Sequence, residues 1–364
     1  MTIGKLVNKL EQLAPPMLQE SYDNSGLIVG NLKTEITKVL ISFDITELVL
    51  QEAKALGANL IISHHPIIFG GLKKLNGSNY VERAVIFAIK NNIALYAAHT
   101  SLDNVIGGTN KLLAEKLGLH HINILQEQSH SLLKIVTYVP FDYLEKVRLA
   151  MFEAGAGYIG QYDQCSFATK GEGTYRALPG ATPFVGEINQ RHLEGEYRLE
   201  TILPSHIKNK VLQAMKQAHP YEEVAYDIYG MENKSKKIGA GIIGKLKEAI
   251  DEESFLKDLK KITGASCIRH TTLRNKPIKK VALCGGSGAF LIKKAKASNA
   301  DIYITGDVKY HEFFDAEDKM IIADVGHYES EQFTCQLLYD YIKENFHTFA
   351  VQISDTNTNP IKYL

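Results

Sequence analysis

The sequence predicts an α/β fold: a mainly parallel sheet domain in two halves, with an inserted α+β domain of ferredoxin-like topology. Two observations indicate the halves. Short apolar runs alternate with helical patterns at both ends of the chain, and several runs end in Asp or His. Such runs are typical of strands that helices cover on both faces. A third observation indicates the insertion, because residues 131–231 change to alternating strands and glycine-rich, aromatic segments.

The composition is that of an ordinary globular protein. The chain has 364 residues, of which 45% are hydrophobic and 23% are charged, which is enough for about two or three domains. Lys+Arg and Asp+Glu each total 41, so no net charge attracts nucleic acid or an anionic membrane. We therefore expect neither as a partner.

The cysteines and the N-terminus indicate a cytoplasmic location. The cysteines are far apart and form no Cys-x-x-Cys pair, so we expect reduced thiols rather than disulfides or a structural zinc site. They are Cys165, Cys267, Cys284 and Cys335. The segment Met1–Lys5 does not begin a signal peptide, and no apolar run reaches membrane-spanning length.

Residues 1–130 form the first predicted half. Residues 3–13 space their apolar side chains as an amphipathic helix, which Pro15-Pro16 stops. The next predicted elements are a turn and strand at 21–30, a strand at 39–44, a helix at 46–56 with Thr46 as N-cap, and strands at 60–63 and 93–98 flanking a helix at 80–90. Ligands collect at the carboxyl ends of parallel strands. The polar residues at such ends are Asp44, His64, His65, His99 and Asp103.

The insertion and the second half follow. The insertion, 131–231, shows a β-α-β-β-α-β order: strand 134–140, helix 142–154, hairpin segment 158–198, strand 197–203, helix 204–217 and strand 224–229. Residues 232–364 return to the first pattern, with strands at 281–284, 301–307 and 320–325 and helices from 289 and 330. We expect 1–130 and 232–364 to form one domain. The turn Gly285-Gly286-Ser287-Gly288 lacks the Lys-Ser/Thr of a P-loop, so we interpret it as a tight turn.

Two motifs could bind a ligand. His64 and His65 stand at a strand end before Pro66, where both rings can face one site, although hydrogen-bonded loop histidines are the commoner case. His327 and Glu331 are four residues apart and share a face if the helix has begun by His327. The alternative is that Glu331 only interacts with a helix N-terminus.

Three further residues are weaker candidates. Asp103 could be a ligand, or a turn residue before Gly107. His99 is more suited to orienting a ligand or carrying a proton than to binding metal. His311 is a candidate at the rim of the site, or simply part of a solvated helix start. No Gly-x-Ser-x-Gly elbow occurs, and no cysteine has a neighbouring histidine.

The strongest candidates together make a metal-ligand set of three imidazoles and two carboxylates. They are His64, His65, Asp103, His327 and Glu331. Such a set suits two divalent ions roughly 3.5–4 Å apart, because closely spaced dications need a bridging carboxylate. Imidazole fits Zn, Fe, Mn, Ni or Co, and zinc is the ion that we expect to be found.

Five motifs resemble those of the Nif-three-like dinuclear-metal family, whose members are often labelled GTP cyclohydrolase 1 type 2 homologues. The motifs are Asp23-Asn24-Ser25-Gly26-Leu27, Ile62-Ser63-His64-His65-Pro66, His99-Thr100-Ser101-Leu102-Asp103, Thr305-Gly306-Asp307 and Gly326-His327-Tyr328-Glu329-Ser330-Glu331. The resemblance covers both α/β halves, and the insertion resembles a PII- or CutA-like domain. It implies that the same five residues are the metal ligands, with Asp103 as the bridge and either His64 or His65 serving either ion. It also implies a toroidal homohexamer with its metal sites facing an inner cavity.

Three functions remain open. The first is a metal-dependent hydrolase for a small molecule such as a nucleotide, with a GTP cyclohydrolase-like attack at C8 of the purine and His99 or His311 transferring a proton. The second is a non-catalytic metal-binding or regulatory hexamer whose insertion senses a ligand. The third is a phosphoesterase, which would act on nucleic acid only with a basic groove that the balanced charge does not indicate.

Overall fold

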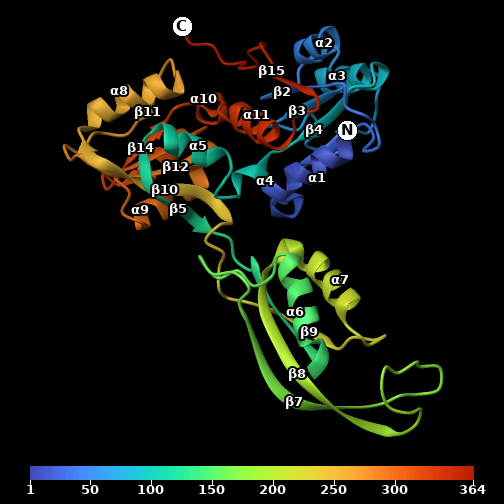
Figure 1. Ribbon diagram of the computed structural model, residues 1–364. Helices are drawn as coiled ribbons and strands as arrows, with labels where there is room; N and C mark the ends of the chain where they lie inside the picture. The colour runs from blue at the N-terminus through green and yellow to red at the C-terminus, as the bar shows by residue number, and fades with distance from the viewer. The chain divides into compact units, whose positions relative to one another are not determined.

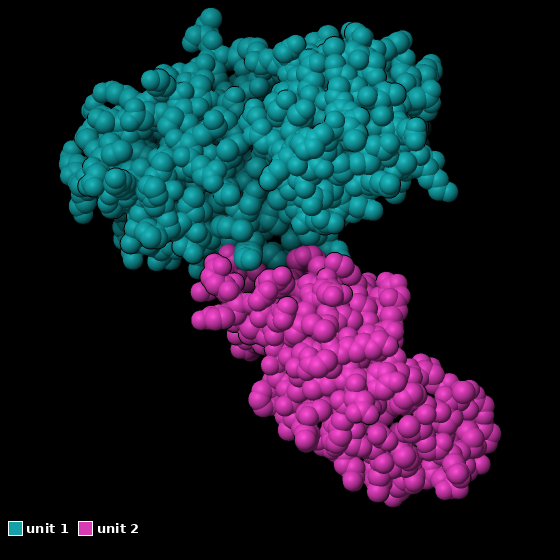
Figure 2. Space-filling view, in the orientation of Figure 1, with its two compact units in different colours: residues 1–127, 237–364 teal, residues 128–236 magenta.

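The computed structural model describes residues 1–364 as two compact units. One comprises residues 1–127 and 237–364, and the other comprises residues 128–236 (Figure 2). The first unit continues into the second after strand β5 (Leu119–Glu127) and resumes before strand β10 (Gly239–Ile250). These two strands pair antiparallel, with Glu127 opposite Gly239, so the two connections leave the first unit side by side.

The first sheet of the larger unit has five strands in the order β1-β4-β3-β2-β15. They are β1 (Gly26–Val29), β4 (Ala94–Ala97), β3 (Leu60–Ser63), β2 (Lys38–Ser42) and β15 (Ala350–Ile353). The last four are parallel to one another, and β1 is antiparallel to β4. Every residue of β3 and β4 is buried, as expected of strands covered on both faces.

Helices cover both faces of this sheet. Helices α2 (Glu47–Ala55) and α3 (Tyr80–Lys90) pack on one face, and α1 (Ile3–Leu13) and α11 (Thr334–Asn345) pack on the other. The predicted cap of α2 is confirmed, because the Thr46 hydroxyl accepts a hydrogen bond from the Val49 N–H at 3.3 Å.

The second sheet has six strands in the order β11-β14-β13-β12-β10-β5. The strands not yet bounded are β11 (Arg269–His270), β14 (Ile321–Asp324), β13 (Ile302–Gly306) and β12 (Ile278–Ser287). The strands β12, β13 and β14 are parallel, whereas the other pairings are antiparallel. Helices α5 (Thr109–Lys116) and α8 (Glu252–Thr263) pack on one face, and α9 (Ile292–Ala297) packs on the other.

The inserted unit contains one antiparallel sheet in the order β7-β8-β6-β9. In chain order its elements are β6 (Leu132–Pro140), α6 (Leu144–Glu153), β7 (Ser166–Arg176), β8 (Arg191–Pro204), α7 (Lys208–Ala218) and β9 (Tyr226–Gly230). This is the β-α-β-β-α-β order of a ferredoxin-like unit. Both helices cover the same face, and β7 and β8 form a long hairpin (Figure 1).

Short helical segments complete the structure. The two that carry candidate ligands are α4 (Thr100–Asp103) and α10 (His327–Glu331). The 3₁₀ helices are η1 (Pro16–Leu18), η2 (Phe141–Tyr143), η3 (Ser205–Ile207), η4 (Ala289–Leu291) and η5 (Tyr310–Ala316). None of the helices has the length and apolar character needed to cross a membrane.

Candidate metal centre

Two histidines follow strand β3 at the carboxyl edge of the first sheet. His64 is fully buried, and its Nδ1 lies 2.9 Å from the Ala98 carbonyl oxygen. A ring nitrogen beside a carbonyl must carry the proton, so Nδ1 donates and Nε2 presents a lone pair. The Nδ1 of His65 similarly lies 2.7 Å from Oδ1 of Asp44, which follows β2. Both rings are therefore oriented with Nε2 free to bind a ligand.

Two further predicted ligands, His327 and Glu331, lie on α10, which follows strand β14 of the second sheet. His327 opens α10 after β14, and its Nδ1 lies 2.7 Å from Oδ2 of Asp307, which follows β13. Glu331 lies one helical turn later on α10 and is only 3% exposed. The helix has begun at His327, so the predicted shared face of His327 and Glu331 is present.

The glycine-rich end of β12 makes room for Glu331. A Cβ at Gly285 would lie 2.7 Å from Cγ of Glu331, and a Cβ at Gly286 would overlap its carboxylate. Gly286 also has a φ of +62°, which favours glycine. Gly285 and Gly286, which we interpreted from the sequence as part of a tight turn, lie instead in the last residues of β12, where they allow a carboxylate to approach the backbone closely.

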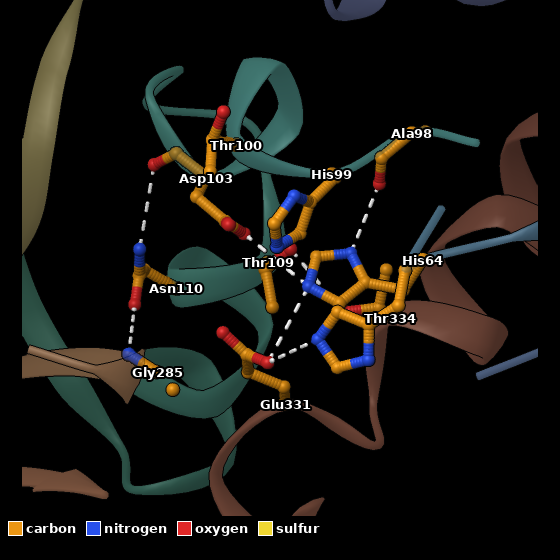
Figure 3. A network of polar contacts seen from close by, with 12 residues as sticks. His64, Ala98, His99, Thr100, Asp103, Thr109, Asn110, Gly285, Glu331 and Thr334 are labelled. Atoms are coloured by element: carbon orange, nitrogen blue, oxygen red, sulfur yellow. Dashed lines mark hydrogen bonds and ion pairs between the residues drawn. The ribbon is translucent and has the colours of Figure 1, made fainter. Parts of the chain in front are cut away.

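One oxygen of Glu331 lies close to three histidines, and Figure 3 shows its contact with one of them, His64. Its Oε2 is 3.1 Å from Nε2 of His327, 3.4 Å from Nε2 of His64 and 3.5 Å from Nε2 of His65. The Oδ1 of Asp103 lies 3.9 Å from Nε2 of His64. All five predicted ligands thus come together, from two sheets and two short helices.

Three buried atoms of this cluster make no hydrogen bond. They are His64 Nε2, Asp103 Oδ1 and Glu331 Oε2. A buried polar atom without a partner costs about 1–3 kcal/mol, so three at one point indicate a place for a ligand. Imidazole nitrogens and carboxylate oxygens are donors that suit divalent transition ions.

Three overlapping groups of side chains could hold a metal ion. They are His65 with His327 and Glu331, His64 with Asp103 and Glu331, and His64 with His65 and His99. Glu331 belongs to the first two groups, whereas Asp103 belongs to one. Glu331, and not the expected bridge Asp103, is thus the carboxylate that two of these groups share.

The charged groups of the site shift one another's pKa values. Burial lowers the pKa of His64, but the carboxylates of Asp103 and Glu331 outweigh it and raise that pKa to about 9. Burial also lowers the pKa of His327, but the carboxylates of Asp307 and Glu331 outweigh this effect and raise that pKa to about 10. Burial raises the pKa of Asp103, whereas His64 and the other imidazoles hold the pKa of Glu331 well below its usual value despite its burial. The carboxylates thus favour positive charge at this point.

His99, a predicted proton-transfer residue, lies in the site. Its ring centroid is 5.3 Å from that of His64 and 5.1 Å from that of His65. Its Nδ1 lies 2.7 Å from Oδ1 of Asp23, whose other oxygen accepts from the Thr100 N–H at 3.0 Å. Burial opposes these contacts, but they hold the pKa of Asp23 well below its usual range. Asp23 stands in one of the five motifs quoted above, but no pattern in the sequence indicated a role for it.

The structure does not bring His311, the other predicted proton-transfer residue, into this site. His311 lies exposed on η5, with its ring packed against Tyr310 at a centroid distance of 5.2 Å. It belongs to none of the groups that could hold a metal and does not line the cavity at the site. A strand-end pattern alone did not distinguish it from a solvated helix start.

A cavity of about 540 Å³ opens over the candidate ligands. Aromatic side chains contribute to its wall, and those more than half exposed are Tyr22, Phe69, Tyr80 and Phe290. The segment near the C-terminus also reaches it, because the Thr358 hydroxyl donates to Oδ2 of Asp44 at 2.6 Å. Sequence reasoning did not identify this contact, since no motif marks Thr358.

Asn110 connects the two halves beside the cluster. Its side-chain amide donates to the Asp103 carbonyl at 3.4 Å, and its side-chain oxygen accepts from the Gly285 N–H at 2.7 Å (Figure 3). On the other side, the Phe43 ring packs against His64 and His65, with centroids 5.5 and 4.6 Å away. The ligands are therefore held by both polar and apolar neighbours.

Comparisons with known proteins identify relatives along nearly the whole chain. The family model described as Duf34/NIF3 (NGG1p interacting factor 3) matches residues 1–360. Proteins of Halalkalibacterium halodurans and Bacillus subtilis, both named GTP cyclohydrolase 1 type 2 homolog, are 38% and 37% identical; each alignment covers 99% of this chain and 98% of the relative. A crystal structure of a Bacillus cereus protein related to NIF3 has a TM-score of 0.86 and 36% identity, covering 100% of this chain and 99% of that one. A Staphylococcus aureus structure has a TM-score of 0.78 and 30% identity at the same coverage.

Proposed function

Because the chain belongs to the Duf34/NIF3 family, we propose that it binds two divalent metal ions and acts as a metal-dependent hydrolase on a small polar substrate such as a nucleotide. The observation that carries this proposal is the position of Glu331 Oε2, within 3.5 Å of three imidazole nitrogens. No ordinary structural role requires three histidines to converge on one buried carboxylate oxygen.

The five ligands divide into two sets that share Glu331. His65 and His327 would hold one ion with it, and His64 and Asp103 would hold the other. Two such ions, for which zinc is our expectation, supply stabilisation of developing negative charge and activation of water.

The surrounding residues perform the remaining tasks. Asp44, Asp307 and the Ala98 carbonyl fix the orientation of three imidazole rings through Nδ1. Asp23 does the same for His99, which leaves Nε2 of His99 directed to hold or move a proton.

A GTP cyclohydrolase-like reaction is the form of hydrolysis that we propose first. Two relatives carry a name of this kind, and a cavity of about 540 Å³ is within the usual range for small-molecule sites. The aromatic rings of Tyr22, Phe69 and Phe290 line it and could stack on a purine. His99 would transfer the proton in this reaction.

The test combines metal analysis with substrate turnover. The purified protein is assayed for bound metals and for release of products from GTP, other nucleotides and phosphoesters, beside Glu331→Gln and Asp103→Ala. We expect metal-dependent turnover of one substrate class, lost in both variants and retained in the control His311→Ala. Two bound ions with no turnover of any of these compounds would contradict the hydrolase proposal and leave the metal site standing.

The inserted unit supports a second candidate function, a non-catalytic metal-binding or regulatory assembly. This unit has a cavity of its own, of about 800 Å³, which a hydrolase site in the other unit does not require. Ligand binding in the inserted unit together with absence of turnover would favour this function over the first.

Our proposal for the assembly is a cytoplasmic homohexamer, as the family resemblance implies. The cysteines form no disulfide, which is compatible with a reducing compartment. Light scattering of the purified protein tests the assembly, because a hexamer has six times the mass of the 40.5 kDa chain. A monomeric mass at micromolar concentration would contradict it.

A further inference from the structure

The cavity of the inserted unit lies on the face of the sheet that its helices leave uncovered. Along β8, Leu199 and Leu203 belong to the core beneath α6 and α7. Successive side chains of a strand point to opposite faces, so Glu196 and Arg198 point to the other face. Both line the cavity of about 800 Å³ beside the β7–β8 hairpin, which Figure 1 shows extending from this unit.

Glu196 is a buried carboxylate without a cation. It is 8% exposed, and its Oε1 accepts a hydrogen bond from the Tyr221 hydroxyl at 2.9 Å. It forms no ion pair, whereas its neighbours on β8 do: Glu194 pairs with His192, and Glu200 pairs with Lys134 and Arg198. Burying an ionised carboxylate is costly unless a positive group compensates.

The backbone is shaped to accommodate this carboxylate. Gly173 on β7 stands beside it, and a Cβ there would overlap Oε2 of Glu196. Oε2 accepts no hydrogen bond from the protein, whereas Oε1 is held by Tyr221. One oxygen is therefore fixed, and the other is left for a ligand.

None of the basic side chains that line the cavity forms an ion pair with Glu196. Arg198 donates to Oε2 of Glu200 at 2.7 Å. The Nζ of Lys170 lies 5.9 Å from the ring centroid of Tyr197, whose side chain points to the opposite face. Arg176 is exposed and forms no ion pair. The positive charge that would compensate Glu196 is thus not supplied by the chain.

Aromatic rings form the wall around this point. The ring of Tyr221 lies 6.1 Å from that of Phe184 and 6.2 Å from that of Tyr175, and Tyr138 also lines the cavity. The Tyr175 hydroxyl donates to the Val185 carbonyl at 2.7 Å, which fixes that ring. Aromatic faces together with a carboxylate are the groups that recognise ammonium ions with apolar substituents.

We propose that the inserted unit binds a small organic ammonium ion, with its positive charge on Glu196 and its apolar substituents against Tyr175, Phe184 and Tyr221. A metal ion fits less well, because every group of side chains that could hold one lies in the other unit. This proposal is independent of the function proposed for the metal centre.

The test is isothermal titration of the full-length protein with two pairs of probes. Choline is compared with its neutral isostere 3,3-dimethyl-1-butanol, and phenethylamine with 2-phenylethanol. We expect saturable binding of at least one ammonium probe and at least tenfold weaker binding of its neutral partner. Equal affinity within both pairs, or no binding of either ammonium probe at 10 mM, would overturn the proposal.

Variants locate the site. Glu196→Gln keeps the shape and the Tyr221 contact but removes the charge, so we expect at least tenfold weaker ammonium binding. Glu200→Gln is the matched control, because Glu200 lies four residues further along β8 on the same strand face and is already paired with Lys134 and Arg198. Far-UV circular dichroism and the Tm verify folding. Unchanged binding in a folded Glu196→Gln protein would also overturn the proposal.

Discussion

The Nε2 atoms of His65 and His327 lie 3.2 Å apart, although 262 positions separate the two residues in the sequence. Each ring has its Nδ1 directed at a carboxylate, Asp44 for His65 and Asp307 for His327. Two Nε2 lone pairs at this distance repel each other unless a proton or a cation lies between them. The contact between the two rings therefore holds the two sheets together only when a proton or a cation lies between the two nitrogens.

Removing metal should destabilise the protein. Binding to the folded state alone adds RT ln(1 + [L]/Kd), which is about 4 kcal/mol at a free metal concentration of 1,000 Kd. We expect the Tm to fall on treatment with a chelator and to recover on addition of Zn²⁺. Differential scanning calorimetry measures the effect, and the same scans of Glu331→Gln should show little response to either addition. A Tm that does not respond to chelator in the unmodified protein would contradict the metal centre.

The two carboxylates should differ in the number of ions that they hold. Glu331 belongs to two groups of potential ligands and Asp103 to one. Glu331→Gln should therefore lose both ions, whereas Asp103→Asn should keep one in the set of His65, His327 and Glu331. Metal content per chain after dialysis, measured by plasma mass spectrometry, distinguishes them. If Asp103→Asn lost both ions and Glu331→Gln did not, Asp103 would be the residue that bridges them.

Metal affinity should rise with pH. Metal binds neutral imidazole, and the carboxylates raise the pKa values of His64 and His327 to about 9 and about 10 against the opposing effect of burial. Both are protonated at neutral pH before the ion binds, so binding releases protons. We expect the apparent Kd for Zn²⁺ to fall by at least about tenfold per pH unit between pH 6 and 8. Competition with a chelating dye at each pH measures it, and a Kd independent of pH would contradict the coupling.

The carboxylate behind His327 should matter although it touches no proposed ion. Asp307 holds Nδ1 of His327 at 2.7 Å. Replacement of such a partner typically costs 10–100-fold in metal affinity, and we expect this from Asp307→Asn. The control is Asp318→Asn, because Asp318 is exposed and has a φ of +52° that asparagine tolerates. Equal affinities of the two variants would indicate that the Asp307 contact is incidental.

Two glycines with similar backbone conformation, Gly286 at the end of β12 and Gly264 at the C-terminus of α8, offer a matched pair of substitutions. Gly286 and Gly264 have φ values of +62° and +66°, so alanine strains the backbone equally at both, by about 1 kcal/mol. A Cβ at Gly264 meets no atom within 4 Å, whereas one at Gly286 overlaps the Glu331 carboxylate. Gly286→Ala should therefore lose bound metal, and Gly264→Ala should only lower the Tm. Full metal content in Gly286→Ala would show that Glu331 can move without loss of the site.

The parts of the fold that follow strong patterns could be predicted from the sequence. The apolar runs of β2, β3 and β4 are buried on both faces, and the residues that follow them converge at one edge. Strands β5 and β10 were not predicted. They are antiparallel and partly exposed, so polar residues such as His120 and Lys247 interrupt their apolar pattern.

The five candidate ligands that the structure brings together were predicted from the sequence, but their arrangement, the position of His311 outside the site and the role of Asp23 were not. The histidine pair and the His327–Glu331 spacing are local features, which a sequence displays. The central place of Glu331 depends on the close approach of β12 to α10, and the Asp23–His99 contact joins residues 76 positions apart. Such relations arise from tertiary packing, which spacing along one chain does not encode.

The pairing of β5 with β10 has a consequence for how the chain can be rebuilt. Glu127 and Gly239 are directly opposite each other in adjacent antiparallel strands. A two-residue hairpin turn can join positions of this kind. The segment between them therefore joins the larger unit through two adjacent strand ends. It could be removed, exchanged or gained during evolution without a change in the order of the other strands of the α/β unit.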